Sequence, residues 1–227
     1  MDPERRVLSL FLSIEGGDGA GKSTQAALLM TRLKAAEVDA LLVHEPGGTA
    51  LGEQVRRLVK GAASPSPVPE LFLFEAARAQ LVQDVIGPAL TAGRVVVTDR
   101  YADSSTAYQG YGRGLDLEDV RALNRIATGG LMPDATILLD MPPERALARV
   151  DGTDGSGGRS DDPDQARFER EPIEFHQRVA EGFRTMAAEE PRRWFVVDAS
   201  AGADAVAEKV WAIVSRLLDV RGIKSHA

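Results

Sequence analysis

Cysteine is absent from this chain of 227 residues, which excludes disulfides, thiolate metal sites and cysteine nucleophiles. The apolar run at residues 7–14 is far too short to cross a bilayer, and the glycine-rich loop that follows it is unlike the end of a signal peptide. Basic side chains are outnumbered by acidic ones, 27 to 34, which argues against a nucleic-acid or anionic-membrane surface. We expect a soluble, cytoplasmic protein with neither a nucleic-acid nor a membrane partner.

Short apolar segments alternate with helical patterns along the chain. Strands are predicted at 7–14, 40–44, 94–99, 135–140 and 194–198. Helices are predicted at 22–36, 49–60, 69–91, 116–128, 142–149, 164–188 and 203–219, with a turn at 63–69. Strands that are apolar on both faces and separated by helices indicate a parallel sheet covered on both sides. The sequence therefore predicts one α/β domain over residues 1–227, with its ligands at the carboxyl ends of the strands.

The segment EGGDGAGKST, residues 15–24, contains the P-loop pattern G-x-x-x-x-G-K-[ST] between a predicted strand and a predicted helix. Its backbone N–H groups and the helix N-terminus favour phosphate, while Lys22 would reach the β- and γ-phosphates and Ser23 would offer its hydroxyl to Mg²⁺. The alternative is a plain glycine turn. The candidate ATP-binding residues are Gly16, Gly17, Asp18, Gly19, Ala20, Gly21, Lys22, Ser23 and Thr24.

A second polar segment, TDRYADSSTAYQG, follows the third predicted strand at residues 98–110. Asp99 at the strand end could support Mg²⁺ or orient Lys22, and Arg100 offers a planar fork that suits phosphate. Tyr108 lies about two helical turns further on, if the segment is helical. By itself, the Asp-Arg pair is explained equally well by a structural ion pair.

Together these segments resemble the thymidylate kinase family, the bacterial dTMP kinases among the nucleoside monophosphate kinases. The matching segments are IEGGDGAGKST (14–24), EPGGT (45–49), FEAARAQLV (74–82), DRYADSSTAYQG (99–110) and PDATILLDMPPERAL (133–147). The resemblance implies a P-loop fold with a five-stranded parallel sheet, ATP and Mg²⁺ on the donor side, dTMP as acceptor, and a homodimer.

The resemblance also assigns roles to single residues. Phe74 would stack on thymine, Arg78 and Ser105 would bond the base, and Tyr108 would fill the space of a 2′-hydroxyl. Without the family, Phe74 is explained as core and Arg78 as a solvated helix face. The residues assigned to dTMP are Asp18, Pro46, Arg56, Phe74, Arg78, Arg100, Ser105, Tyr108 and Gln109.

The stretch DGTDGSGGRSDD, residues 151–162, is glycine-rich and nearly free of apolar side chains. One subgroup of the family has a P-loop arginine where this chain has Gly19, and the other carries arginines on a mobile lid. We therefore expect a lid at about 150–166, with the catalytic arginine being Arg149, Arg159 or Arg167. The alternative is an idle surface loop. Two departures from the family are His44, where arginine is usual, and Ala166, where aspartate is common.

Other functions remain open from the sequence. A kinase for nucleosides, or for a different monophosphate, would share the P-loop and differ in its acceptor. A P-loop ATPase switch would hydrolyse ATP without an acceptor, but it leaves EPGGT and AYQG without a role. A purely structural nucleotide-binding module leaves Lys22, Ser23 and Asp99 unexplained.

Overall fold

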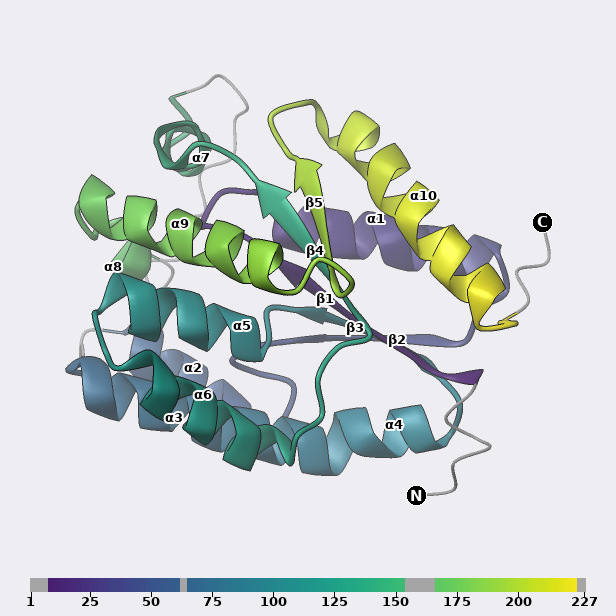
Figure 1. Ribbon diagram of the computed structural model, residues 1–227, viewed down its shortest axis with the longest axis horizontal. Coiled ribbons are helices and arrows are strands. Elements are labelled where there is room, and N and C mark those ends of the chain that lie inside the picture. Colours follow the sequence, from purple (N-terminus) through teal and green to yellow (C-terminus); the bar gives the residue numbers. More distant parts are fainter. Residues whose placement is uncertain (1–7, 62–64, 154–165, 224–227) are drawn as a thin grey trace.

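The computed structural model describes residues 8–61, 65–153 and 166–223. A parallel sheet of five strands runs through its centre, in the order β2-β3-β1-β4-β5 (Figure 1). The strands are β1 (Leu10–Glu15), β2 (Ala40–His44), β3 (Val95–Asp99), β4 (Ala135–Asp140) and β5 (Trp194–Asp198). Asp99 is in register with both Ile14 and His44, so three strands end at one edge. The predicted parallel sheet is confirmed.

Helices cover both faces of the sheet. The α-helices are α1 (Lys22–Ala35), α2 (Ala50–Lys60), α3 (Pro67–Leu81), α4 (Gly87–Thr91), α5 (Ala102–Ser105), α6 (Leu117–Thr128), α7 (Pro143–Val150), α8 (Ala166–Glu169), α9 (Ile173–Glu189) and α10 (Ala203–Val220). Two π-helical segments, η2 (Val82–Ile86) and η3 (Thr106–Gly112), continue α3 and α5. Figure 1 shows α1 and α10 on one side of the sheet, with α3, α4 and α6 on the other. In the described part of the chain, no helix is long and apolar enough to span a membrane.

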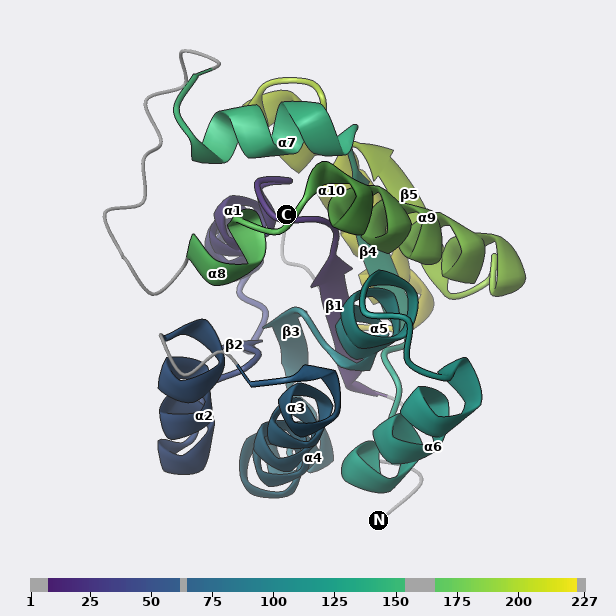
Figure 2. The same cartoon turned by 90° about the vertical axis from the view of Figure 1, so that its left-hand side faces the viewer.

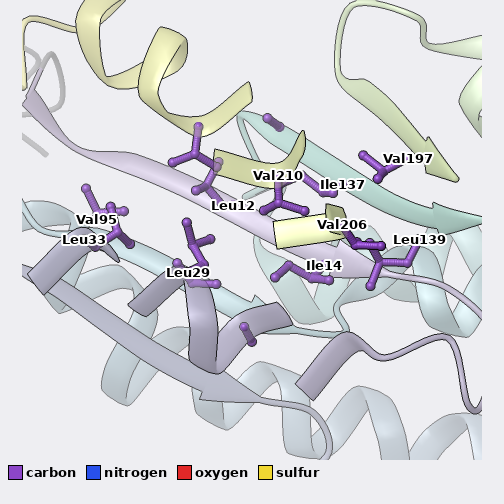
Figure 3. Close-up of a cluster of buried hydrophobic side chains, with 14 of the residues drawn as sticks. Leu12, Ile14, Leu29, Leu33, Val95, Ile137, Leu139, Val197, Val206 and Val210 are labelled. Carbon is purple, nitrogen blue, oxygen red and sulfur yellow. The ribbon is translucent and has the colours of Figure 1, made fainter. Parts of the chain in front are cut away.

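The largest hydrophobic core lies between the sheet, α1 and α10. Leu29 and Leu33 of α1 and Val206 and Val210 of α10 belong to this core. Figure 3 shows Leu33 beside Val95 of β3 and Val206 beside Leu139 of β4, with Leu12 of β1 between the two helices. Every residue of β1 is buried, as expected for the central strand of a doubly covered sheet. This packing fixes the carboxyl end of β1, from which the P-loop leaves.

Several predicted boundaries are wrong, and local chemistry explains them. The first strand begins at Leu10, not at 7; Val7 lies outside the described residues. The predicted turn at 63–69 ends earlier, because α3 already starts at Pro67, a residue favoured in the first turn of a helix. The predicted helix 164–188 is two helices, because Pro172 is the N-cap of α9 and the residue before a proline disfavours helical geometry.

Candidate nucleotide-binding site

A cleft of about 1040 Å³ lies at the carboxyl ends of β1, β2 and β3. Figure 2 shows α7 and α9 above this edge of the sheet and α2 and α3 below it. The predicted residues that line the cleft are Asp18, Gly19, Ala20, Gly21, Lys22, Ser23, Thr24, Pro46, Arg56, Phe74, Arg78, Asp99, Arg100, Ser105, Tyr108, Gln109 and Arg149. The structure thus brings residues from distant parts of the sequence into one cavity.

The P-loop connects β1 to α1 with Lys22 at its base. The Lys22 ammonium is buried and donates to the carbonyl of Gly17 at 2.7 Å. Burial, together with the nearby charge of Arg100, lowers the pKa of Lys22 from its ordinary 10.5 to about 8. Ser23 donates its hydroxyl to Asp99 at 2.5 Å, which joins the start of α1 to the end of β3. The loop therefore presents a desolvated cation beside a hydroxyl–carboxylate pair.

Gly19 packs directly against α7. Its φ is +78°, and a Cβ built there would lie 2.0 Å from the carbonyl oxygen of Ala146 and 2.9 Å from Val150. A side chain at this position would require α7 to move away from the loop. Position 19 has no arginine in this chain, and α7 occupies the space that the side chain of an arginine at that position would need.

Arg100 is the centre of a polar cluster that joins the loop to the helices after β3. Its Nη2 donates to Asp18 at 2.5 Å and to the Tyr108 hydroxyl at 2.9 Å, and its Nη1 donates to Gly16 and Ser104. The Tyr108 hydroxyl in turn donates to Asp18 at 2.9 Å. Burial acts to raise the pKa of Asp18, but Arg100 and Lys22 outweigh it and keep that pKa below its ordinary value. Asp18 is therefore ionised and fixed.

Glu15 belongs to this cluster, although the sequence reading did not select it. Its carboxylate is fully buried at the end of β1 and accepts from the Tyr101 N–H at 2.7 Å and from the hydroxyls of Ser13 and Ser104. Burial and the nearby Asp103 raise the pKa of Glu15 to about 7. A glutamate at the end of a mainly apolar strand was the available signal. Its contacts fix the backbone on which Arg100 is carried.

Arg78 is 1% exposed, so the alternative of a solvated helix face is wrong. The guanidinium hydrogen-bonds Glu45, Glu75, Asn124, Ser105 and the carbonyl of Tyr101. These contacts engage all five of its N–H groups. A direct bond from Arg78 to a base requires one of them to break. Burial raises the pKa of Glu45 to about 7 even beside Arg78.

Aromatic side chains form one wall of the cleft. Phe74 packs on Val55 and Val59 of α2, and its ring centroid lies 6.3 Å from that of Phe168. Phe168 also meets Tyr108 edge-on, with the centroids 5.7 Å apart. Phe74 is therefore part of a small core and part of the cleft lining at once. Phe168, which comes from α8, is a wall residue that the sequence reading missed.

The three candidate lid arginines are separated by the structure. Arg149 lines the cleft and donates to the carbonyls of Ala199, Ser200 and Ala201, at the start of the loop before α10. Arg167 does not line the cleft; it bonds the carbonyls of Val59 and Pro65 and pairs with Glu70 at 2.7 Å. Arg159 and most of the predicted lid lie outside the described residues.

Glu70 is a second residue that the sequence reading missed. It is fully buried and accepts from Gln109 at 2.9 Å and from Arg113, besides pairing with Arg167. It therefore connects α3 with η3 and with α8. Two other residues that line the cleft, His44 and Arg56, contact their neighbours near α2. His44 Nε2 lies 3.3 Å from Glu53 Oε1, and Arg56 donates to the carbonyl of Pro46 at 3.1 Å.

A P-loop between the first strand and the first helix of a parallel sheet, with an arginine directly after the neighbouring strand, defines a P-loop nucleotide-binding protein. The family model described as "Thymidylate kinase" matches residues 14–210. The chain belongs to the thymidylate kinase family.

Similar proteins share this description. The thymidylate kinase of Synechococcus sp. (strain JA-2-3B'a(2-13)) is 48% identical over 205 residues, covering 90% of this chain and 94% of that protein. That of Solidesulfovibrio magneticus is 46% identical over 211 residues, covering 92% and 100%. The crystal structure of thymidylate kinase from Ehrlichia chaffeensis superposes with a TM-score of 0.73 at 30% identity, covering 91% of this chain and 98% of that one.

Proposed function

We propose that the cleft holds ATP over the P-loop and dTMP beyond Arg100, and transfers the γ-phosphoryl group to give dTDP and ADP. As a member of the thymidylate kinase family, the chain is an ATP-dependent kinase of dTMP. The observation that carries the placement is the Arg100 cluster. Arg100 bonds Gly16 and Asp18 of the loop itself, so the second phosphate-binding cation is anchored on the first phosphate site.

The donor side is formed by residues 16–24 and by the segment before α10. The N–H groups of the loop and the end of α1 would bind the ATP phosphates, with Lys22 between the β- and γ-phosphates. Ala199, Ala201, Gly202 and Ala203 line the same cleft and suit the nucleoside. Binding of a polyphosphate would strengthen the positive charge on Lys22, because its lowered pKa rises again beside an anion.

Ser23 and Asp99 together have side chains that suit a magnesium ion. Both offer oxygen atoms, 2.5 Å apart, and Mg²⁺ is commonly held by one or two protein oxygens together with phosphates and waters. Among the described residues, no cluster of three histidine, cysteine, aspartate or glutamate side chains could hold a metal without such help. Mg²⁺ bound there would neutralise charge on the transferring phosphoryl group. We propose Ser23 and Asp99 as its protein ligands.

On the acceptor side, Arg100 and Arg56 would bind the dTMP phosphate, and Asp18 would contact the deoxyribose. Tyr108 is fixed by two hydrogen bonds, to Arg100 and Asp18, so its ring is a rigid wall for the sugar. Phe74 would stack on thymine, opposite Pro46. The base edge would meet Ser105 and Gln109, with Arg78 acting mainly by holding Ser105 at 3.0 Å. Transfer then depends on alignment and charge neutralisation in a site closed to water.

The lid arginine stays a choice among three. Arg149 lines the donor end of the cleft, which suits a cation near the ATP phosphates. Arg167 is instead part of the ion-pair group around Glu70, which suits a role in holding α8 over the acceptor. We propose that Phe168, placed on α8 next to Arg167, closes the acceptor pocket from that side.

We also propose a homodimer through α2, α3 and α6. These helices lie side by side (Figure 2), and each exposes a large apolar side chain: Leu58 at 48%, Phe72 at 54% and Ile126 at 77%. A partner molecule on these adjoining helices would cover such exposed apolar side chains. Light scattering of the chain and of a Phe72→Glu variant tests this, since the variant should be monomeric.

A panel of acceptors tests the function. With ATP and Mg²⁺, dTMP should be phosphorylated in preference to AMP, CMP and thymidine. Preference for thymidine would indicate a nucleoside kinase, and preference for CMP or AMP a different monophosphate kinase. Substantial ATP hydrolysis with no acceptor would indicate an ATPase switch instead.

A further inference from the structure

His176 of α9 has a buried ring nitrogen that the protein itself does not satisfy. The residue is 5% exposed, and within the described ranges its Nε2 has no hydrogen-bond partner. A buried nitrogen without a partner costs about as much as a lost hydrogen bond, so such atoms usually bind water or serve a function. None of the roles assigned above uses His176.

The imidazole lines a small cavity behind the P-loop, separate from the nucleotide cleft. The cavity has a volume of about 20 Å³, and His176 shares its wall with Gly17 and Asp18 of the loop. That volume exceeds the space that one water molecule needs. Asp140, the other titratable residue in the wall, accepts from Arg184 at 3.1 Å. The cavity is therefore a suitable place for one water between α9 and the loop.

Asp18 is the residue that connects this cavity to the acceptor side. Its oxygens accept from Arg100 at 2.5 Å and from Tyr108 at 2.9 Å, both of which belong to the cleft. The same residue lines the small cavity together with His176. Arg100, Lys22 and Tyr108 lower the pKa of Asp18 most, and His176 lowers it least. A carboxylate has acceptor capacity left after two such bonds.

We propose that His176 is a positioning residue that holds Asp18 in place for the acceptor sugar, through a water bound to its Nε2. The proposal rests on the proposed function, since Asp18 is the assigned sugar contact. His176 does not line the nucleotide cleft and would act only through Asp18, so loss of its hydrogen bond should affect acceptor binding more than donor binding. A glutamine in its place has an amide of similar reach and should retain the contact, whereas leucine removes it.

Kinetics of full-length His176→Leu and His176→Gln, beside the wild type, test the proposal. The leucine variant should raise the KM for dTMP about tenfold, the equivalent of about 1.4 kcal/mol, while the KM for ATP changes less than about threefold. The glutamine variant should stay within about threefold of the wild type for both. Met186→Ala, a buried change on α9 that lines neither cavity, is the control and should lower the melting temperature without raising either KM.

The proposal is overturned if the leucine variant keeps the wild-type KM for dTMP, or if glutamine is as harmful as leucine. A second measurement needs no variant to fold: the ¹⁵N resonance of His176 in the wild type should shift when dTMP is added without ATP. If calorimetry shows dTMP binding and the resonance stays unchanged, His176 does not position Asp18. If dTMP neither binds nor is phosphorylated by the wild type, the proposed function itself fails.

Discussion

Adding one methyl group at different glycines of the P-loop should have three different effects on stability. At Gly17 the backbone is not left-handed, and among the described residues nothing lies within 4 Å of an added Cβ. At Gly21 φ is +93°, again without such a neighbour. At Gly19 φ is +78° and the Cβ would lie 2.0 Å from the Ala146 carbonyl. The three positions therefore separate backbone strain from steric contact.

The magnitudes follow from these two contributions. Gly17→Ala should change the free energy of unfolding by less than about 0.5 kcal/mol, since it adds no strain. Gly21→Ala should cost about 1 kcal/mol, the left-handed penalty less the gain from a stiffer unfolded chain. Gly19→Ala adds an overpacking cost of about 1–3 kcal/mol, because the neighbour is helix backbone rather than a flexible side chain.

Thermal unfolding without nucleotide measures this series. At about 2–4 °C per kcal/mol for a chain of this size, Gly19→Ala should melt about 5–15 °C below Gly17→Ala, with Gly21→Ala between them. If Gly19→Ala and Gly21→Ala have the same melting temperature, α7 moves away from the added methyl group at little cost. The explanation given above for the glycine at position 19 would then be wrong.

Four further predictions concern nucleotide binding and catalysis. Lys22→Ala should lower turnover at least about a hundredfold with an unchanged circular dichroism spectrum, because its charge acts on the transition state; normal turnover would refute the role. The pKa of Lys22 is lowered to about 8, so the wild type should take up protons when it binds ATP at pH 8. The Lys22→Arg variant at pH 8 and the wild type at pH 6 should take up none. Calorimetry in two buffers would measure this difference. Tyr108→Ala should lower the ratio of the specificity constant for deoxyribonucleoside monophosphates to that for ribonucleoside monophosphates. An unchanged ratio would show that another residue excludes the 2′-hydroxyl. Arg149, Arg159 and Arg167 should each be changed to alanine, and at least one variant should turn over about a hundredfold more slowly with its dTMP affinity unchanged. If all three variants turn over normally, none of these arginines is catalytic.

The parts of the site that lie in one segment could be predicted from the sequence. The P-loop, the Asp99–Arg100 pair and the strand ends that bring them together follow from local motifs and from the rule that parallel strands end at one edge. Tyr108 was expected two turns beyond Arg100 only if that segment is helical, and the structure has α5 and η3 there. Pro172 also indicated a helix boundary, and this would have divided the predicted helix 164–188 into two.

The rest depended on contacts between distant segments. Whether Arg78 faces solvent or a buried carboxylate is decided by Glu45, 33 residues earlier in the chain, and no helical pattern contains that information. Glu70 and His176 look like ordinary helix residues until α8 and the P-loop are packed against them. The sequence could show that position 19 is glycine where one subgroup of the family has arginine. It could not show that α7 packs against this position. The homodimer, the cytoplasmic location and the lid motion stay predictions.

The most direct test of the account is whether one cleft holds both nucleotides at once. An analogue that joins adenosine to thymidine through five phosphates should bind one molecule per chain in calorimetry with Mg²⁺. It should be displaced by ATP and by dTMP, each alone, and Arg100→Ala should weaken it strongly because that side chain belongs to both halves of the site. An analogue displaced by ATP but unaffected by dTMP would contradict the account, because the acceptor would then bind outside the cleft.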